Sequence, residues 1–194
     1  MLFEPNVIYH IYNQGNNKEL IFYKEENYLF FLKKTRLLIS PYAEFLAYCL
    51  MPNHFHWLII AKPDGCEWAS HLKFPIPRQV LNHQINILLR SYGRAINNQE
   101  GRTGSLFRQH TKGKTGWEDP FVEASRRKSS TQGFVFGLDN QYAYNCFNYI
   151  HQNPVEANLV LKGTDWIYSS ARDYAGIRSG TLCNQSLAKD LLNF

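Results

Sequence analysis

The chain has 194 residues, and 44% of them are apolar, which suits one globular domain with a sizeable core. No apolar run is long enough to cross a membrane, and the N-terminus lacks the segments of a secretory signal, so we expect a cytoplasmic protein. The four cysteines form no Cys-x-x-Cys pair, which argues against a zinc ribbon and a secreted disulfide framework. The net charge of +5 is too small to indicate a polyanionic partner by itself.

The first half of the chain predicts a strand, a helix and a hairpin of two strands. Their expected ranges are 7–14 for the first strand, 24–39 for the helix, and 43–51 and 54–61 for the hairpin. Ser40 and Pro41 end the helix, and Pro52 with Asn53 makes a short turn within the hairpin.

The second half predicts a long helix over 80–98, a fourth strand over 105–111, a flexible insertion over 113–137, and helices over 138–152 and from Pro154. The order β-α-β-β-α-β is that of the ferredoxin-like split motif. We therefore expect a single α+β domain over 1–194, with an antiparallel sheet, helices on one face, an insertion and a C-terminal helical segment. The tail from Trp166 is expected to fold back onto this core.

Two histidines lie in the second strand of the hairpin, where residues 51–57 read Met-Pro-Asn-His-Phe-His-Trp. Because side chains alternate along a strand, His54 and His56 share one face, and Phe55 and Trp57 share the other. Two neighbouring imidazoles can supply two ligands of a divalent-metal site. Two ordinary histidines on a half-buried strand fit the same pattern.

The segment 149–155, Tyr-Ile-His-Gln-Asn-Pro-Val, carries further candidates. Tyr149 and Asn153 are four residues apart, so on a helix they share a face. If that face meets the strand of His54 and His56, the cluster holds two imidazoles, an amide oxygen and a phenol. Such a ligand set suits a borderline or hard ion such as Mn²⁺ or Mg²⁺.

In this combination the chain resembles the HUH single-tyrosine transposases, and most closely the REP-associated tyrosine transposases. The likeness rests on five segments in order, 9–17, 51–57, 104–109, 149–160 and 166–170. Residues 62–79 and 113–137 match poorly.

The resemblance implies an enzyme that cleaves and rejoins single-stranded or hairpin DNA through a 5′-phosphotyrosine, with Mg²⁺ or Mn²⁺ as cofactor. It assigns Tyr149 as the nucleophile and His54, His56 and Asn153 as the metal ligands; insertion-sequence relatives carry Gln where Asn153 stands. A domesticated hairpin-DNA-binding protein without transposition activity is the alternative. The protein is expected to be a monomer or a homodimer.

Other interpretations of these residues remain open. Tyr149 could pack in the core, with Tyr142 or Tyr144 as the nucleophile instead. Asn-Pro-Val-Glu at 153–156 also matches a helix start, in which Asn153 would cap backbone N–H groups. His151, two residues from Tyr149, is expected on another helix face, at the surface or against phosphate.

Contacts with DNA are expected from the basic middle of the chain. Nine Lys and Arg residues, against four acidic ones, lie between residues 90 and 128. Arg90 and Arg94 are four residues apart and could grip one backbone, as could Arg108 and Lys112. Asn13 is a polar residue able to reach base edges. Solvated side chains at the surface are the alternative for each.

Overall fold

The computed structural model describes residues 2–69, 77–115 and 136–194. Most of the expected insertion at 113–137 therefore lies outside the described residues. Within the described ranges, no helix combines the length and the apolar character that a membrane span requires.

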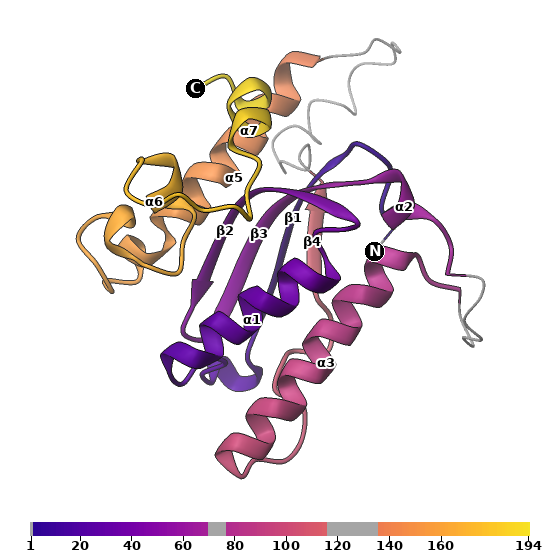
Figure 1. The fold of residues 1–194 in the computed structure, drawn as a ribbon, viewed down its shortest axis with the longest axis vertical. Helices are drawn as coiled ribbons and strands as arrows, with labels where there is room; N and C mark the ends of the chain where they lie inside the picture. The colour runs from indigo at the N-terminus through magenta and orange to yellow at the C-terminus, as the bar shows by residue number, and fades with distance from the viewer. Residues whose placement is uncertain (1, 70–76, 116–135) are drawn as a thin grey trace, which may run out of the picture.

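The centre of the fold is a four-stranded antiparallel sheet in the order β2-β3-β1-β4 (Figure 1). Its strands are β1 (Ile8–Gln14), β2 (Ala43–Met51), β3 (His54–Ala61) and β4 (Lys112–Thr115). The helices are η1 (Asn16–Lys18), α1 (Glu25–Leu38), α2 (Pro63–Cys66), α3 (Val80–Glu100), α5 (Phe136–Glu156), η2 (Gly163–Asp165), α6 (Ala171–Tyr174) and α7 (Gln185–Leu192). The order of elements and the pairing confirm the expected ferredoxin-like α+β fold.

Alternation along the strands divides the core into two layers. Phe55 and Trp57 of β3 are fully buried on the face that α1 and α3 cover side by side. Leu58 is buried on the opposite face, where it packs with Ile150 of α5. The two helices of the ferredoxin-like motif thus share one face, and the C-terminal helical segment covers the other. This second face is the one on which His54 and His56 lie.

The prediction of a fourth strand over 105–111 is wrong, because β4 begins at Lys112. Leu106 and Phe107 are adjacent and both buried, whereas a regular strand with one solvated face buries alternate residues. Their segment crosses the end of β1: Phe107 forms an isolated bridge with Gly15, and the Arg108 N–H donates to the Gln14 carbonyl at 2.9 Å.

The prediction of a new helix from Pro154 is also wrong, because α5 runs through this proline to Glu156. The Asn153 carbonyl accepts the N–H of Ala157 at 3.0 Å, as inside a helix. Asn153 is therefore a helical residue, and its side chain contacts β3 and does not cap α5.

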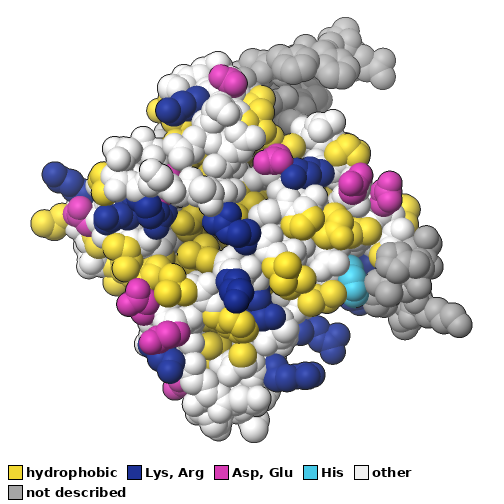
Figure 2. Space-filling view, in the orientation of Figure 1, with side chains coloured by type: hydrophobic (Ala, Val, Ile, Leu, Met, Phe, Trp, Pro, Cys, Tyr) yellow, Lys and Arg dark blue, Asp and Glu magenta, His cyan; other side chains and the backbone are white. Residues whose placement is uncertain are grey.

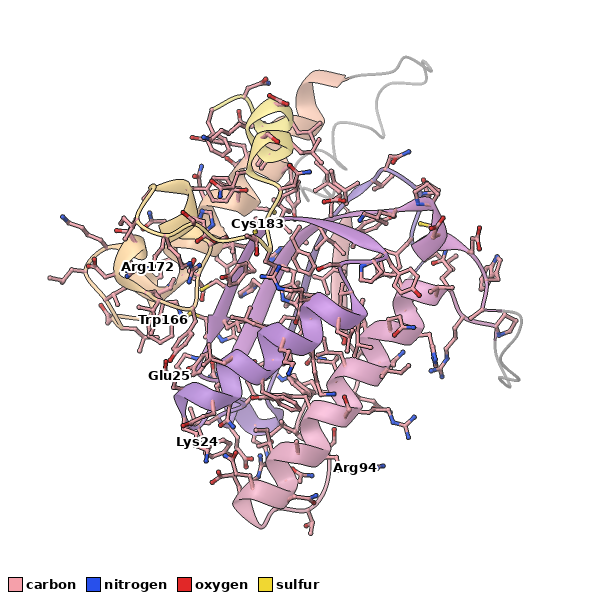
Figure 3. All side chains as sticks on the ribbon, viewed as in Figure 1. Lys24, Glu25, Arg94, Trp166, Arg172 and Cys183 are labelled. Carbon is pink, nitrogen blue, oxygen red and sulfur yellow. The ribbon has the colours of Figure 1, made fainter. Side chains whose placement is uncertain are left out.

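The tail folds back onto β2, as expected. Trp166, which Figure 3 labels beside the strands, donates its indole N–H to the Leu50 carbonyl at 2.9 Å. The Tyr174 hydroxyl donates to the Leu46 carbonyl at 2.5 Å. These bonds fix the C-terminal segment against the edge strand and support α5 in its place on the sheet.

Candidate active site

The β2–β3 turn positions His54. Its tip is anchored because the Pro52 carbonyl accepts the N–H groups of Ile21 and Phe22 at 2.8 and 3.0 Å. The Asn53 Oδ1 lies 2.6 Å from His54 Nδ1, and the Asn153 Oδ1 lies 3.0 Å from His54 Nε2. Both partners of the imidazole are therefore amide oxygens.

In one tautomer of His54, the contact between its Nε2 and the Asn153 Oδ1 brings two acceptors together. When Nδ1–H donates to Asn53, a neutral His54 turns an unprotonated Nε2 toward the Asn153 oxygen. A cation relieves this opposition of lone pairs. At a separation of 3.0 Å, these two atoms are close enough to bind the same ion.

His56 lies beside His54 on the same face, with the ring centroids 5.0 Å apart and the planes nearly perpendicular. Its Nδ1 is 2.9 Å from His10 Nε2. Its Nε2 is buried and has no hydrogen-bond partner among the residues that the structure describes. An orphaned buried nitrogen is costly unless something absent from the protein chain satisfies it.

Burial keeps both imidazoles in the neutral form that binds metals. Desolvation lowers the pKa of His54, with the Asn153 contact acting in the opposite direction. Desolvation also lowers the pKa of His56 well below its usual value, and the neighbouring His10 and His54 lower it further. A neutral imidazole has the lone pair that a metal requires.

Tyr149 lies one turn before Asn153 on α5 and reaches the same place. Its ring centroid is 5.4 Å from that of His56, and the residue is 42% exposed. It lines an open pocket of about 370 Å³ together with His10, Tyr12, His56, Tyr142, Asn145 and Cys146. A phosphate group arriving from solvent can therefore meet the phenol beside the imidazoles.

The two competing tyrosines differ in position. Tyr144 packs against the second core layer and Phe194, with a ring-centroid distance of 6.2 Å. Tyr142 lies two turns before Tyr149 and lines the same pocket. Of the two alternative nucleophiles, Tyr142 is therefore the one that lies near the candidate active site.

His54, His56 and Asn153 fit a divalent ion, although they are not a conventional ligand cluster. Among the described residues, no three His, Cys, Asp or Glu side chains are grouped to hold a metal. The set found here has two imidazoles and one amide oxygen. The orphaned nitrogen of His56 and the 3.0 Å approach of Asn153 Oδ1 to His54 Nε2 are the observations that support an ion.

A groove of about 700 Å³ opens between α3 and the 102–111 segment, and four of the five expected DNA-contact residues line it: Asn13, Arg90, Arg94 and Arg108. Lys and Arg side chains project from the lower right of the molecule, along α3, in Figure 2. Arg94, labelled in Figure 3, extends outward from this helix. The floor of the groove includes the apolar residues Ile85, Leu89, Leu106 and Phe107.

Of the five expected DNA-contact residues, Asn13 and Lys112 do not present their side chains to the groove in the way that the three arginines do. Asn13 is only 3% exposed; its amide donates to Thr111 Oγ1 at 2.9 Å and to the Arg108 carbonyl at 3.3 Å. It therefore braces the wall of the groove. Lys112 pairs with Tyr12, which pairs with His56, so Lys112 lies on the face of the candidate active site.

Sequence reasoning missed His10 and misplaced His151. His10 contacts His56 only because β1 lies next to β3, and no local pattern reveals that pairing. His151 is buried, with its Nε2 2.7 Å from Ser170 Oγ, so the expectation of a surface or phosphate contact is wrong. Helix spacing alone does not reveal this tertiary contact between α5 and Ser170 of the tail.

No protein-family model matches the chain, and no curated protein matches it. Among solved structures, a REP-associated tyrosine transposase bound to a REP hairpin superposes with a TM-score of 0.54, over 95% of this chain and 92% of that one. The two sequences are 13% identical, so the likeness concerns the fold. The chain has the fold of a REP-associated tyrosine transposase.

Proposed function

We propose that this protein is a transposase of the HUH single-tyrosine type, a metal-dependent enzyme that cleaves and rejoins single-stranded or hairpin DNA. The observation that carries this proposal is the convergence of four side chains from two elements. His54 of β3 contacts Asn153 of α5 at 3.0 Å, and His56, next to His54 on the strand, lines an open pocket with Tyr149 of α5. The similarity in fold to a hairpin-bound transposase supports the same assignment.

His54 Nε2, His56 Nε2 and Asn153 Oδ1 are the atoms that would hold the ion. A divalent cation bound there, Mg²⁺ or Mn²⁺, would draw charge from the phosphorus and from the leaving oxygen. This help matters because a phenol with a pKa of about 10 is a weak nucleophile at neutral pH.

Tyr149 supplies the nucleophile. Its hydroxyl oxygen attacks a backbone phosphorus; one P–O bond forms and the bond to the 3′ oxygen breaks. The phenolic proton passes to solvent, and the leaving 3′ oxygen takes up a proton to become a 3′-OH. Because bonds of the same kind are exchanged, the 5′-phosphotyrosine retains the energy needed for rejoining, and no ATP is consumed.

The groove between α3 and the 102–111 segment is proposed as the track for the DNA. Arg90, Arg94 and Arg108 offer cationic groups to phosphates, and the apolar floor offers surface to unpaired bases. Lys112 would contact DNA on the other face, near His56. Asn13 contributes by holding Arg108 and Thr111 in place.

The decisive experiment detects covalent protein–DNA adducts on denaturing gels, with single-stranded oligonucleotides and Mg²⁺ or Mn²⁺. Tyr149→Phe removes one oxygen from an exposed residue, so it should fold and bind DNA normally but form no adduct. Tyr142→Phe and Tyr144→Phe are the matched controls and should retain the adduct. EDTA should abolish the adduct in every protein that forms one.

Each alternative has its own result. An adduct that persists in Tyr149→Phe and disappears in Tyr142→Phe would assign the nucleophile to the other tyrosine of the pocket. Hairpin binding by the unmodified protein, with no adduct under any metal condition, would identify a DNA-binding protein that has kept the fold without transposition activity.

A further inference from the structure

His10 lies beside the proposed metal ligands but has no role in the proposed chemistry. It is buried at 6% exposure, on the strand adjacent to β3. Its Nε2 lies 2.9 Å from His56 Nδ1, and the two rings are stacked with centroids 5.0 Å apart. On its other side, His10 Nδ1 lies 4.0 Å from Cys146 Sγ of α5.

The contact between the two imidazoles permits only one donor. If His10 Nε2–H donates, a neutral His56 carries its hydrogen on Nε2, where no described residue offers an acceptor. If His56 Nδ1–H donates, the unprotonated nitrogen is Nε2, which a cation can satisfy. The second arrangement leaves no permanently unsatisfied buried N–H group.

We propose that His10 is a positioning residue that fixes the tautomer of His56. Its Nε2 accepts the Nδ1 hydrogen of His56, so the Nε2 lone pair of His56 is directed toward the ion. His10 then carries its own hydrogen on Nδ1, toward Cys146 Sγ. The resulting chain, Cys146–His10–His56, prepares the ligand before any metal binds. This inference rests on the proposed metal site.

The first test needs no variant and no catalysis. Nitrogen-15 NMR of imidazole groups in the metal-free protein distinguishes the two neutral tautomers. We expect His56 to carry its hydrogen on Nδ1. A hydrogen on His56 Nε2 would overturn the inference, whatever the activity of the protein.

The second test compares Mn²⁺ affinity by calorimetry in two variants of similar bulk. His10→Phe keeps a ring but has no acceptor, and should weaken binding roughly 10- to 100-fold, as is usual when a partner of a metal-binding histidine is lost. His10→Gln places an amide oxygen near the position of Nε2 and should restore most of the affinity. Thermal unfolding of both variants shows whether the fold persists.

The outcomes separate this inference from the proposed function. Equal Mn²⁺ affinity in wild type and His10→Phe would reject the role of His10 and leave the metal site intact. A failure of Gln to rescue a folded protein would also reject it, because packing rather than the acceptor would then matter. No Mn²⁺ binding by the wild type would refute the metal site and the inference together.

Discussion

Asn153 is the residue whose role depends most on its position in the fold. An amide oxygen is a weaker ligand for Mg²⁺ or Mn²⁺ than a carboxylate, yet it adds no charge that would repel the phosphate of DNA. Because α5 continues through Pro154, the side chain is not occupied in capping and instead lies 3.0 Å from His54 Nε2.

Substitutions at Asn153 distinguish ligation from capping. Asn153→Ala should reduce Mn²⁺ affinity by at least tenfold while stability stays nearly unchanged, whereas loss of a cap costs about 1 kcal/mol. Asn153→Asp keeps an oxygen and should bind Mn²⁺ at least as well as the wild type. Calorimetry measures affinity and urea denaturation measures stability; a clear loss of stability with normal affinity would contradict the assignment.

For single residues, the sequence predicted those candidate site residues that share a face through strand or helix periodicity. Strand alternation placed His54 and His56 on the same face of their strand. Helical spacing placed Tyr149 and Asn153 on the same face of their helix. His10 and Tyr12 have the same alternation, but their proximity to His56 follows from the pairing of β1 with β3, which is not a local property. Residues that act through a neighbouring strand therefore escape such reasoning.

At the scale of elements, α3 combines two functions. Its buried side, with Leu81, Leu88 and Tyr92, completes the core, while Arg90 and Arg94 remain exposed beside the groove. The opposite wall, 102–111, is irregular and depends on the Asn13 side chain. One wall of the groove is thus the regular helix α3, and the other is the segment 102–111, whose shape depends on a few hydrogen bonds.

Arg90 and Arg94 should contribute to DNA binding through charge. Each substitution to Ala should weaken the binding of single-stranded DNA and lower the salt dependence, log K against log [salt], by roughly 0.7 per lost phosphate contact. Lys189→Ala on α7 is the matched control, since it removes one exposed charge outside the groove. Fluorescence anisotropy over a salt series measures both effects; equal losses in the control would remove the groove from the DNA path.

The elements that local sequence could not predict are those with tertiary causes. The hairpin of β2 and β3 matched its predicted ranges, because both strands are β-rich and the Pro52–Asn53 turn is local. The fourth strand was shifted because Leu106 and Phe107 fill the core at the end of β1. The helix start at Asn153 was a plausible local signal that the contact with His54 overrides.

At the scale of the whole molecule, the candidate active site and the groove lie on opposite faces of the sheet. The groove lies on the face of α1 and α3, and the Tyr149 pocket lies on the face of α5. They approach each other where β1 ends: Gln14 pairs with His54, and its carbonyl accepts the N–H of Arg108. A strand of DNA that uses both must pass over this end of the sheet.

Such a path requires a flexible, unpaired strand, which gives a prediction about the form of the substrate. A stiff blunt duplex cannot turn over the end of a small sheet, and its bases are not available to the apolar floor of the groove. Oligonucleotides that are single-stranded, or hairpins with an unpaired extension, should therefore bind more tightly than a blunt duplex of equal length. Anisotropy at several salt concentrations measures this, and binding of all forms should weaken as salt rises because phosphate contacts release counterions. The adduct should form only where the unpaired strand is present. Equal affinity for the blunt duplex, or adduct formation on it, would mean that the DNA does not follow a path from the groove to Tyr149.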